Sequence, residues 1–251
     1  MTLQEFFAKN TRAAIAFSGG VDSSYLLYAA VQCGADVHAY FAKTAFQPQF
    51  ELDDARRLAG SVGAKLTVLE LDALSSEDVA RNPANRCYYC KQNIFGNLKR
   101  AAAEDRFTLI LDGTNASDDA GDRPGMRALR EMDVRSPLRE CGLTKAKIRR
   151  LSHEAGLFTW NKPAYACLAT RVPTGEPITA EKLRAVERSE AFLFALGFTD
   201  LRVRLRDGGA LLQLPAAQHA AARAQWPEIT AGLSEYFPTI QLDPKARAES
   251  E

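Results

Sequence analysis

The sequence predicts an α/β fold in which a doubly wound parallel sheet is followed by a smaller C-terminal α+β domain. Over the first 160 residues, short apolar segments bounded by turn residues alternate with longer helical patterns, as in parallel strands joined by helices. Beyond residue 179 the order becomes a helix, a strand pair turned at Asp207-Gly208-Gly209, another helix and a last strand. We therefore expect two domains, residues 1–160 and 161–251.

The first strand is expected at residues 13–17, where five small or apolar residues precede a Gly-Gly turn and a helix that ends near Gly34. The next four elements should be a strand, a helix and two further strands, at residues 37–42, 49–62, 65–71 and 107–111. A later helix is expected at 145–155, followed in the C-terminal domain by a helix at 180–196 and a strand pair within 201–214. Ligands of such a sheet bind beyond the carboxyl ends of its strands, where the motifs SGGVDS and DGTN both fall.

Two long segments, residues 72–86 and 158–179, interrupt the alternation of strands and helices. The first is polar and leads into Cys87-Tyr88-Tyr89-Cys90, and the second is rich in proline and brackets Cys167. Loops of this length inside a compact domain tend to carry function. Because both segments are associated with cysteine, we expect them to contribute to the site.

Charge balance and cysteine count narrow the function classes. With 32 basic and 31 acidic side chains the net charge is +1, so no global positive charge favours nucleic acid as a partner. The N-terminus lacks a basic segment followed by an apolar core, and no apolar run approaches a membrane span, so we expect a cytoplasmic protein without a membrane partner. Five cysteines, an odd number, argue against a disulfide framework and leave reduced thiols, a metal site or sulfur chemistry.

The motif SGGVDS, residues 18–23, predicts an anion site. Glycines permit positive φ and close backbone approach, and a helix that starts there presents unpaired N–H groups and the positive end of its dipole. The motif lacks the lysine of a Walker A loop, and an ordinary βα turn with an N-cap is the alternative. The candidate anion-binding residues are Ser18, Gly19, Gly20, Val21, Asp22 and Ser23, with Gly113 lining the same pocket.

The spacing of Cys87 and Cys90 lets two sulfurs share one metal or cluster, and Cys167 is the candidate third ligand. Three thiolates leave a fourth position open. A zinc site would normally add a fourth Cys or His, and iron–sulfur clusters usually have four cysteines. Two unrelated thiols packed beside Tyr88 and Tyr89 are the alternative.

SGGVDS resembles the pyrophosphate loop, SGGxDS, of the N-type ATP pyrophosphatases, the PP-loop superfamily. The resemblance implies an adenine nucleotide alpha hydrolase-like fold for residues 1–160. It also implies that the loop holds the β and γ phosphates of ATP while a substrate oxygen attacks the α phosphorus. Mg²⁺ would neutralise charge on the leaving group, with Asp22 or Asp118 reaching the ion.

The chain as a whole resembles the LarE family of ATP-dependent sulfur transferases of nickel-pincer nucleotide biosynthesis. The pieces that carry the resemblance are FSGGVDSSYLL, NPANRCYYCK, DGTNASDD, RSPLRECGLTKAKIRRL, PAYACLATRVPTGEPIT and LGFTDLRVR. The family adenylates the carboxylates of pyridinium biscarboxylic acid mononucleotide and converts them to thiocarboxylates. The resemblance implies that residues 161–251 bind this mononucleotide and form a homo-oligomer.

Two branches of the family differ in their sulfur source. In one, the single cysteine of an ACLAxR motif, Cys167 here, gives up its sulfur and becomes dehydroalanine. In the other, three cysteines hold a 4Fe-4S cluster whose open iron carries an extra sulfide. Cys87, Cys90 and Cys167 match the second branch, so the resemblance implies a catalytic cluster supplied by sulfide or another sulfur donor.

Three more positions match substrate-binding residues of the family. Arg202 and Arg204 match arginines used at the mononucleotide phosphate, which suits the bidentate geometry of guanidinium, and Glu190 matches a carboxylate of the site. The alternatives are two solvent-facing arginines on a strand and an exposed helix charge. The chain departs from the family at Gln213, which replaces a carboxylate, and in its C-terminal tail.

Two rival functions remain open from the sequence. A tRNA thiolase of the same loop superfamily would retain tRNA on purification, although the chain shows no added tRNA-binding module. A non-enzymatic iron–sulfur or ATP-binding regulatory protein would carry an idle SGGVDS loop. Release of AMP and pyrophosphate with a carboxylate substrate separates the enzyme from the binding protein.

Overall fold

The structure is a computed structural model that describes residues 1–118 and 124–248, and these fold into two compact units. The first unit comprises Met1–Ala73 and Asn85–Lys162, and the second comprises Leu74–Ala84 and Pro163–Glu251. The second unit thus includes residues 74–84, from a segment inside the expected first domain. Asp119, the last residue of DGTNASDD, and residues 249–251 of the tail lie outside the described residues.

The first unit is built on a four-stranded parallel sheet with the order β3-β2-β1-β4. Its central pairing places Ile15 of β1 opposite Ala39 of β2 and Leu111 of β4. The predicted α/β class is confirmed. The strands are β1 (Arg12–Ala16), β2 (Asp36–Lys43), β3 (Lys65–Glu70) and β4 (Ile110–Leu111).

β4 is shorter than the strand predicted at residues 107–111. The Phe107 N–H donates to the carbonyl of Ala102 at 2.7 Å, and Arg106 has a φ of 62°. Residues 106 and 107 therefore close the C-terminus of the preceding helix instead of continuing the strand.

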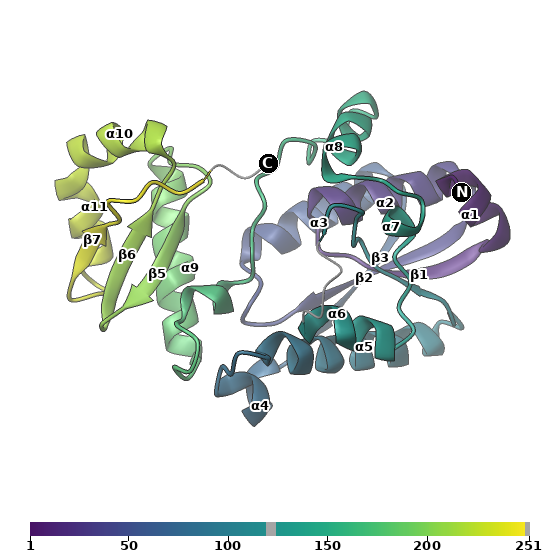
Figure 1. The fold of residues 1–251 in the computed structure, drawn as a ribbon, viewed down its shortest axis with the longest axis horizontal. Helices are drawn as coiled ribbons and strands as arrows, with labels where there is room; N and C mark the ends of the chain where they lie inside the picture. Colours follow the sequence, from purple (N-terminus) through teal and green to yellow (C-terminus); the bar gives the residue numbers. More distant parts are fainter. Residues whose placement is uncertain (119–123, 249–251) are drawn as a thin grey trace. The chain divides into compact units, whose positions relative to one another are not determined.

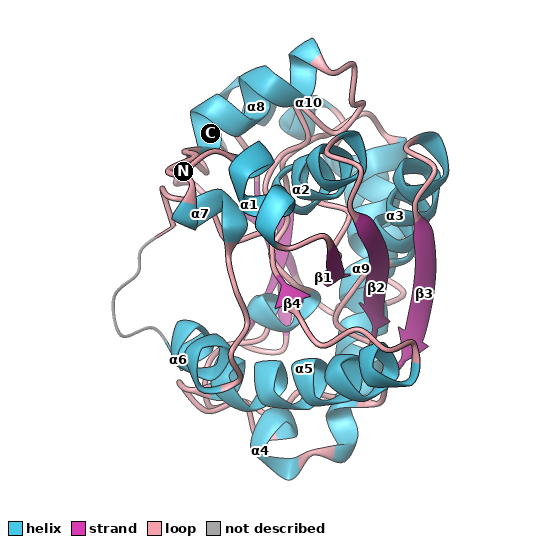
Figure 2. Cartoon of the chain, turned by 90° about the vertical axis from the view of Figure 1, so that its right-hand side faces the viewer, coloured by secondary structure: helices cyan, strands magenta, loops and turns pink. Residues whose placement is uncertain are grey.

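Helices cover both faces of this sheet (Figures 1 and 2). Ala13 and Ile15 belong to the core beneath one group of helices, whereas Ala14 belongs to the core beneath the other. This alternation is the period of two expected for a strand covered on both faces. One group is α1 (Leu3–Lys9), α2 (Val21–Gln32), α3 (Gln49–Ser61), α7 (Pro137–Glu140) and α8 (Lys145–Glu154), and the other is α5 (Arg86–Glu104) and α6 (Pro124–Glu131).

The motif CYYC lies on a helix, which the sequence pattern did not reveal. α5 begins at Arg86, and its buried residues Phe95, Leu98 and Ala102 recur at helical spacing to form one apolar stripe. The segment 72–86, predicted as an irregular loop, contains the short helices η1 (Ala73–Ser75) and α4 (Glu77–Ala80).

The second unit has a three-stranded sheet with the order β5-β6-β7. β5 (Arg202–Arg206) and β6 (Gly209–Gln213) form the predicted antiparallel pair, and β7 (Ile240–Leu242) lies parallel to β6. Asp207 and Gly208 turn the pair with φ values of 50° and 75°, the left-handed conformations of a tight hairpin turn. Besides α4, the described helices of this unit are η2 (Leu168–Arg171), α9 (Ala180–Ala195), η3 (Ala216–Gln218), α10 (His219–Ala224) and α11 (Trp226–Leu233).

Among the helices in the described ranges, none combines the length and the apolar character that crossing a membrane requires.

Candidate functional site

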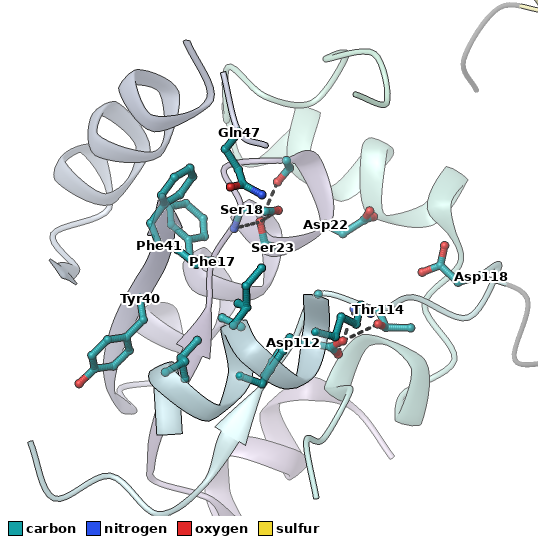
Figure 3. Close-up of a pocket in the computed structure, with 18 residues that line it drawn as sticks. Phe17, Ser18, Asp22, Ser23, Tyr40, Phe41, Gln47, Asp112, Thr114 and Asp118 are labelled. Atoms are coloured by element: carbon teal, nitrogen blue, oxygen red, sulfur yellow. Dashed lines mark hydrogen bonds between the residues drawn. The ribbon is translucent and has the colours of Figure 1, made fainter. Parts of the chain in front are cut away.

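A cavity of about 330 Å³ lies at the carboxyl ends of the parallel strands in the first unit (Figure 3). Phe17 after β1, Ala42 at the end of β2 and Asp112 after β4 all line it. The strand order reverses on either side of β1, which makes this position the switch point where open α/β sheets bind ligands. The location predicted for the site therefore coincides with a cavity of the first unit.

The structure brings part of the SGGVDS motif to this cavity. Its lining includes Ser18, Gly20, Asp22 and Ser23, together with Gly113. The other two motif residues lie elsewhere: Gly19 packs against α3, and the Val21 side chain belongs to the hydrophobic core.

Backbone contacts explain why the loop needs its first glycine. Gly19 has a φ of +69°, and a Cβ atom there would lie 3.0 Å from the carbonyl oxygen of Glu51 on α3. Both the left-handed conformation and the close approach exclude a side chain. Gly20 is the N-cap of α2 and provides no side-chain cap, so the first N–H groups of α2 keep their capacity to bind an acceptor.

Ser23 lies in the first turn of α2, because the helix starts at Val21. Its hydroxyl donates to the carbonyl of Gly20 at 3.2 Å and accepts the Ser18 N–H at 3.3 Å. A Cβ on Gly113 would stand only 2.9 Å from the Ser23 nitrogen. Ser23 and Gly113 therefore determine the shape of the loop.

The two carboxylate oxygens of Asp22 differ in their contacts. Lys145 Nζ lies 2.7 Å from Oδ2, whereas Oδ1 is buried and has no hydrogen-bond partner among the described residues. Burial raises the pKa of Asp22, with Lys145 acting in the opposite direction. A carboxylate oxygen of this kind fits a hard cation such as Mg²⁺, and Figure 3 shows Asp118 near Asp22 on the same side of the cavity.

The sequence did not predict that three lysines lie near the loop. Lys145 pairs with Asp22, and Lys162 Nζ donates to the Gly19 carbonyl at 3.4 Å while pairing with Asp54 at 2.6 Å. Lys91 lines the cavity, and burial lowers its pKa. The available signal was that Lys91 and Lys145 stand inside the family-like pieces CYYCK and TKAK.

The cysteines divide between the units. Cys87 and Cys90 belong to the first turns of α5, three residues apart and so on one helix face, and Cys167 caps η2 in the second unit. Cys87 is exposed, and the Arg86 guanidinium donates to its sulfur at 3.7 Å. None of these cysteines forms a disulfide, and within the described part of either unit no three His, Cys, Asp or Glu side chains form a group that could hold a metal.

The arginines of β5 are held by the second unit. Arg202 is only 4% exposed and donates to the carbonyls of Leu201 and Ala164. Arg204 donates to the carbonyl of Thr170 at 2.7 Å and to Gln213 at 2.6 Å. Burial lowers the pKa of Arg202 to about 10, aided by the neighbouring Arg171. The alternative of two solvent-facing arginines is therefore wrong for Arg202.

Glu190 is buried as well, so the alternative of an exposed helix charge is wrong. Its carboxylate pairs with Arg171 at 2.9 Å and accepts the Val203 N–H at 2.9 Å. Gln213 accepts from Arg204 and donates to Asp243 at 2.8 Å. The amide thus links Arg204 to a carboxylate on a different segment.

These features define an α/β protein with a glycine-containing loop between the first strand and its helix, at the switch point of a parallel sheet. No established family profile matches the chain.

Comparison with curated proteins gives the family. The chain is 35% identical over 209 residues to the pyridinium-3,5-bisthiocarboxylic acid mononucleotide synthase of Lactiplantibacillus plantarum, covering 82% of this chain and 76% of that enzyme. It is 38% identical over 219 residues to an uncharacterized protein of Synechocystis sp., with coverage of 86% and 81%. An uncharacterized protein of Methanocaldococcus jannaschii is 31% identical over 205 residues, with coverage of 82% and 77%. The chain therefore belongs to the LarE family, that of the Lactiplantibacillus synthase, and the expectation of an enzyme is confirmed at this level.

Proposed function

We propose that this protein is an ATP-dependent sulfur transferase that converts carboxylates of pyridinium-3,5-biscarboxylic acid mononucleotide to thiocarboxylates. The name of the Lactiplantibacillus relative specifies the bisthiocarboxylic acid product. The observation that carries the proposal is the cavity at the switch point, where a helix start without a side-chain cap meets an Asp22 oxygen that has no hydrogen-bond partner among the described residues.

The first step would be adenylation. A substrate carboxylate oxygen attacks the α phosphorus of ATP, and pyrophosphate leaves with the electron pair of the broken P–O bond. The N–H groups at the start of α2 and the ammonium groups of Lys145 and Lys162 are suited to bind the leaving pyrophosphate. Asp22 and Asp118 would hold Mg²⁺, which supplies positive charge to the leaving group.

The substrate mononucleotide would bind through Arg202 and Arg204. Both arginines belong to β5 and are two residues apart, so they project from the same face of the strand. Their guanidinium groups already contact protein carbonyls, which orients them before a phosphate arrives. Glu190 belongs to the same cluster through Val203.

Sulfur would then replace AMP at the activated carbonyl carbon. If these residues hold a 4Fe-4S cluster, Cys87, Cys90 and Cys167 would supply three thiolates and leave one iron without a protein ligand. When bound, the cluster would supply a sulfide at that iron, replenished from sulfide or another sulfur donor. In the alternative mechanism the Cys167 sulfur itself is transferred and dehydroalanine remains.

The test is turnover of anaerobically purified protein with ATP, Mg²⁺, sulfide and the biscarboxylic acid mononucleotide. We expect AMP, pyrophosphate and a product in which sulfur replaces oxygen, measured by chromatography and mass spectrometry. An optical spectrum with iron and sulfide analysis tests the cluster separately. Absence of AMP with this substrate contradicts the adenylation, and retained tRNA would favour a thiolase.

A further inference from the structure

One buried arginine in the second unit has no role in the reaction described above. Arg171 ends the helix η2 that starts after Cys167, and its side chain is fully buried. A buried guanidinium needs a partner for its N–H groups as well as a compensating charge. The identity of those partners indicates what the residue does.

The guanidinium group of Arg171 donates hydrogen bonds both to a carboxylate and to backbone carbonyls. Its Nε and Nη2 donate to the two carboxylate oxygens of Glu190 at 2.9 and 3.0 Å, a bidentate pair. Its Nη1 donates to the carbonyls of Ala166 and Cys167 at 2.6 and 3.3 Å. We call residues 164–171 the cysteine segment. Arg171 therefore ties the backbone on either side of the cysteine to α9.

Glu190 extends this connection to β5. Beyond its pair with Arg171, its carboxylate accepts the Val203 N–H at 2.9 Å and the hydroxyl of Tyr165. Both oxygens thus serve protein donors, which leaves Glu190 without capacity for a direct contact to substrate. Val203 lies between the two arginines of β5 in sequence, so the carboxylate is bonded to the strand that presents them.

The two arginines of β5 also donate hydrogen bonds to the cysteine segment. Arg202 donates to the carbonyl of Ala164 and Arg204 to that of Thr170. The Arg202 guanidinium carbon lies 4.9 Å from the ring centre of Tyr165, and that of Arg171 lies 4.5 Å from it. The cysteine segment is therefore connected to β5 both through Glu190 and directly.

We propose that Arg171 is a positioning residue that, through Glu190, fixes the Cys167 sulfur relative to β5. The proposal rests on the proposed function for the identity of the reaction. Sulfur transfer to an activated carboxylate requires sulfur and substrate to meet in a defined geometry, and small misplacements of reacting groups cost large factors in rate. Arg171 also makes Glu190 a part of this support and not a substrate ligand.

The test compares Arg171→Lys with Arg184→Lys. Lysine keeps the charge but cannot reproduce the planar fork that bonds both Glu190 and the carbonyls. The control residue Arg184 is exposed on α9, the helix that carries Glu190. Thiocarboxylate formed per pyrophosphate released should fall by about tenfold or more in Arg171→Lys, because positioning of sulfur and not adenylation is impaired. Arg184→Lys should retain the wild-type ratio.

A second measurement follows the cysteine directly. Iodoacetamide labelling of the protein as purified, followed by peptide mass spectrometry, compares Cys167 with Cys33, an exposed thiol of the first unit. Arg171→Lys should change the labelling rate of Cys167 by about threefold or more relative to Cys33, because the segment loses its fixed conformation. General destabilisation would change both rates together.

The outcomes separate the two proposals. A folded Arg171→Lys protein with wild-type product ratio and wild-type Cys167 labelling overturns the positioning role. If Arg171→Lys does not fold, Glu190→Gln, which preserves shape, replaces it in both measurements, and failure of both variants to fold shows a purely structural pair and also overturns the role. A wild-type protein that releases no AMP contradicts the proposed function, while the labelling comparison still decides the positioning role.

Discussion

The two units hold their charged groups in opposite ways. In the first unit Asp22 lines the cavity and pairs with Lys145, with side chains 22% and 23% exposed, and one Asp22 oxygen has no hydrogen-bond partner among the described residues. In the second unit the side chains of Arg171 and Glu190 are 0% and 1% exposed, and protein groups satisfy them. The first arrangement is suited to receive a ligand, and the second to hold other groups in place. Substitution of Asp22 should therefore affect chemistry and leave stability almost unchanged, whereas loss of one partner of the Arg171–Glu190 pair should also cost stability.

The largest effect is expected at the cysteines, which both units contribute. If three thiolates hold a cluster, Cys87→Ala, Cys90→Ala and Cys167→Ala should each abolish thiocarboxylate formation and lower iron content together. Adenylation should persist, as measured by pyrophosphate release. The sacrificial mechanism predicts instead that only Cys167→Ala loses the first turnover, and that active protein becomes lighter by roughly 34 Da as the sulfur leaves.

Arg171→Met should have the largest effect on stability. Removing one partner of a buried ion pair leaves Glu190 charged and uncompensated, which costs about 3–5 kcal/mol. Denaturant unfolding monitored by circular dichroism measures the loss. The matched control is Arg184→Met on the surface of α9, expected to cost at most about 1 kcal/mol. Equal losses at the two positions would contradict the contrast between buried and exposed pairs.

Asp22→Ala should reduce AMP formation by about 100-fold, since it removes the carboxylate proposed to hold Mg²⁺. Its free energy of unfolding should change little, because the side chain lies beside the cavity and not in the core. Ser23→Ala should act in the same direction by altering the loop. The control is Asp36→Asn, whose side chain is 65% exposed at the start of β2. Wild-type AMP production by Asp22→Ala would disprove the assignment of the loop.

Gly113→Ala tests whether the loop after β4 must approach α2 closely. Its Cβ would stand 2.9 Å from the Ser23 nitrogen, so we expect a loss of about 1–3 kcal/mol in the free energy of unfolding from overpacking. Gly96→Ala on α5 meets no atom within 4 Å and should instead stabilise by about 0.5–1 kcal/mol. Chemical denaturation of both variants provides the comparison, and a shift of the same sign in both would refute the steric argument.

The smallest effect is expected for Arg204→Ala, because Arg204 is the less buried of the two arginines of β5. A guanidinium that binds a phosphate in ground and transition states alike should affect KM by about tenfold and kcat less. Arg202→Ala should act likewise but with a greater loss of stability, because Arg202 is more deeply buried. Steady-state kinetics with varied mononucleotide and saturating ATP gives the split. A change confined to the affinity for ATP would show that these arginines serve the other substrate.

Local patterns along the chain predicted most of the first unit. Apolar segments near a glycine indicate β1 and β2, because both strands pack into the cores on the two faces of the sheet and so lose polar alternation. β3, which also follows a glycine, is only partly buried. β4 and α5 were harder to predict. Phe107 is apolar like a strand residue, but its N–H closes the end of α5, and the apolar stripe of α5 is narrow among polar residues.

The functional site also has features that local patterns predict and features that they do not. The motif SGGVDS predicted where a cavity would form, since the order of strand, glycines and helix places backbone N–H groups at the sheet edge by local geometry alone. Periodicity could not indicate that Lys145, 123 residues along the chain, pairs with Asp22, or that Val21 belongs to the core. Such contacts depend on how distant helices pack.

The sequence by itself determined the α/β class, the position of the loop and the family, because these depend on short-range backbone preferences and on motifs that can be compared directly. Only the tertiary structure decided that Glu190 and Arg202 are buried. The sequence does not show whether a charged residue lies on a helix surface or in a core. Its burial is stable only where a partner distant in sequence, such as Arg171 for Glu190, supplies an opposite charge and hydrogen bonds.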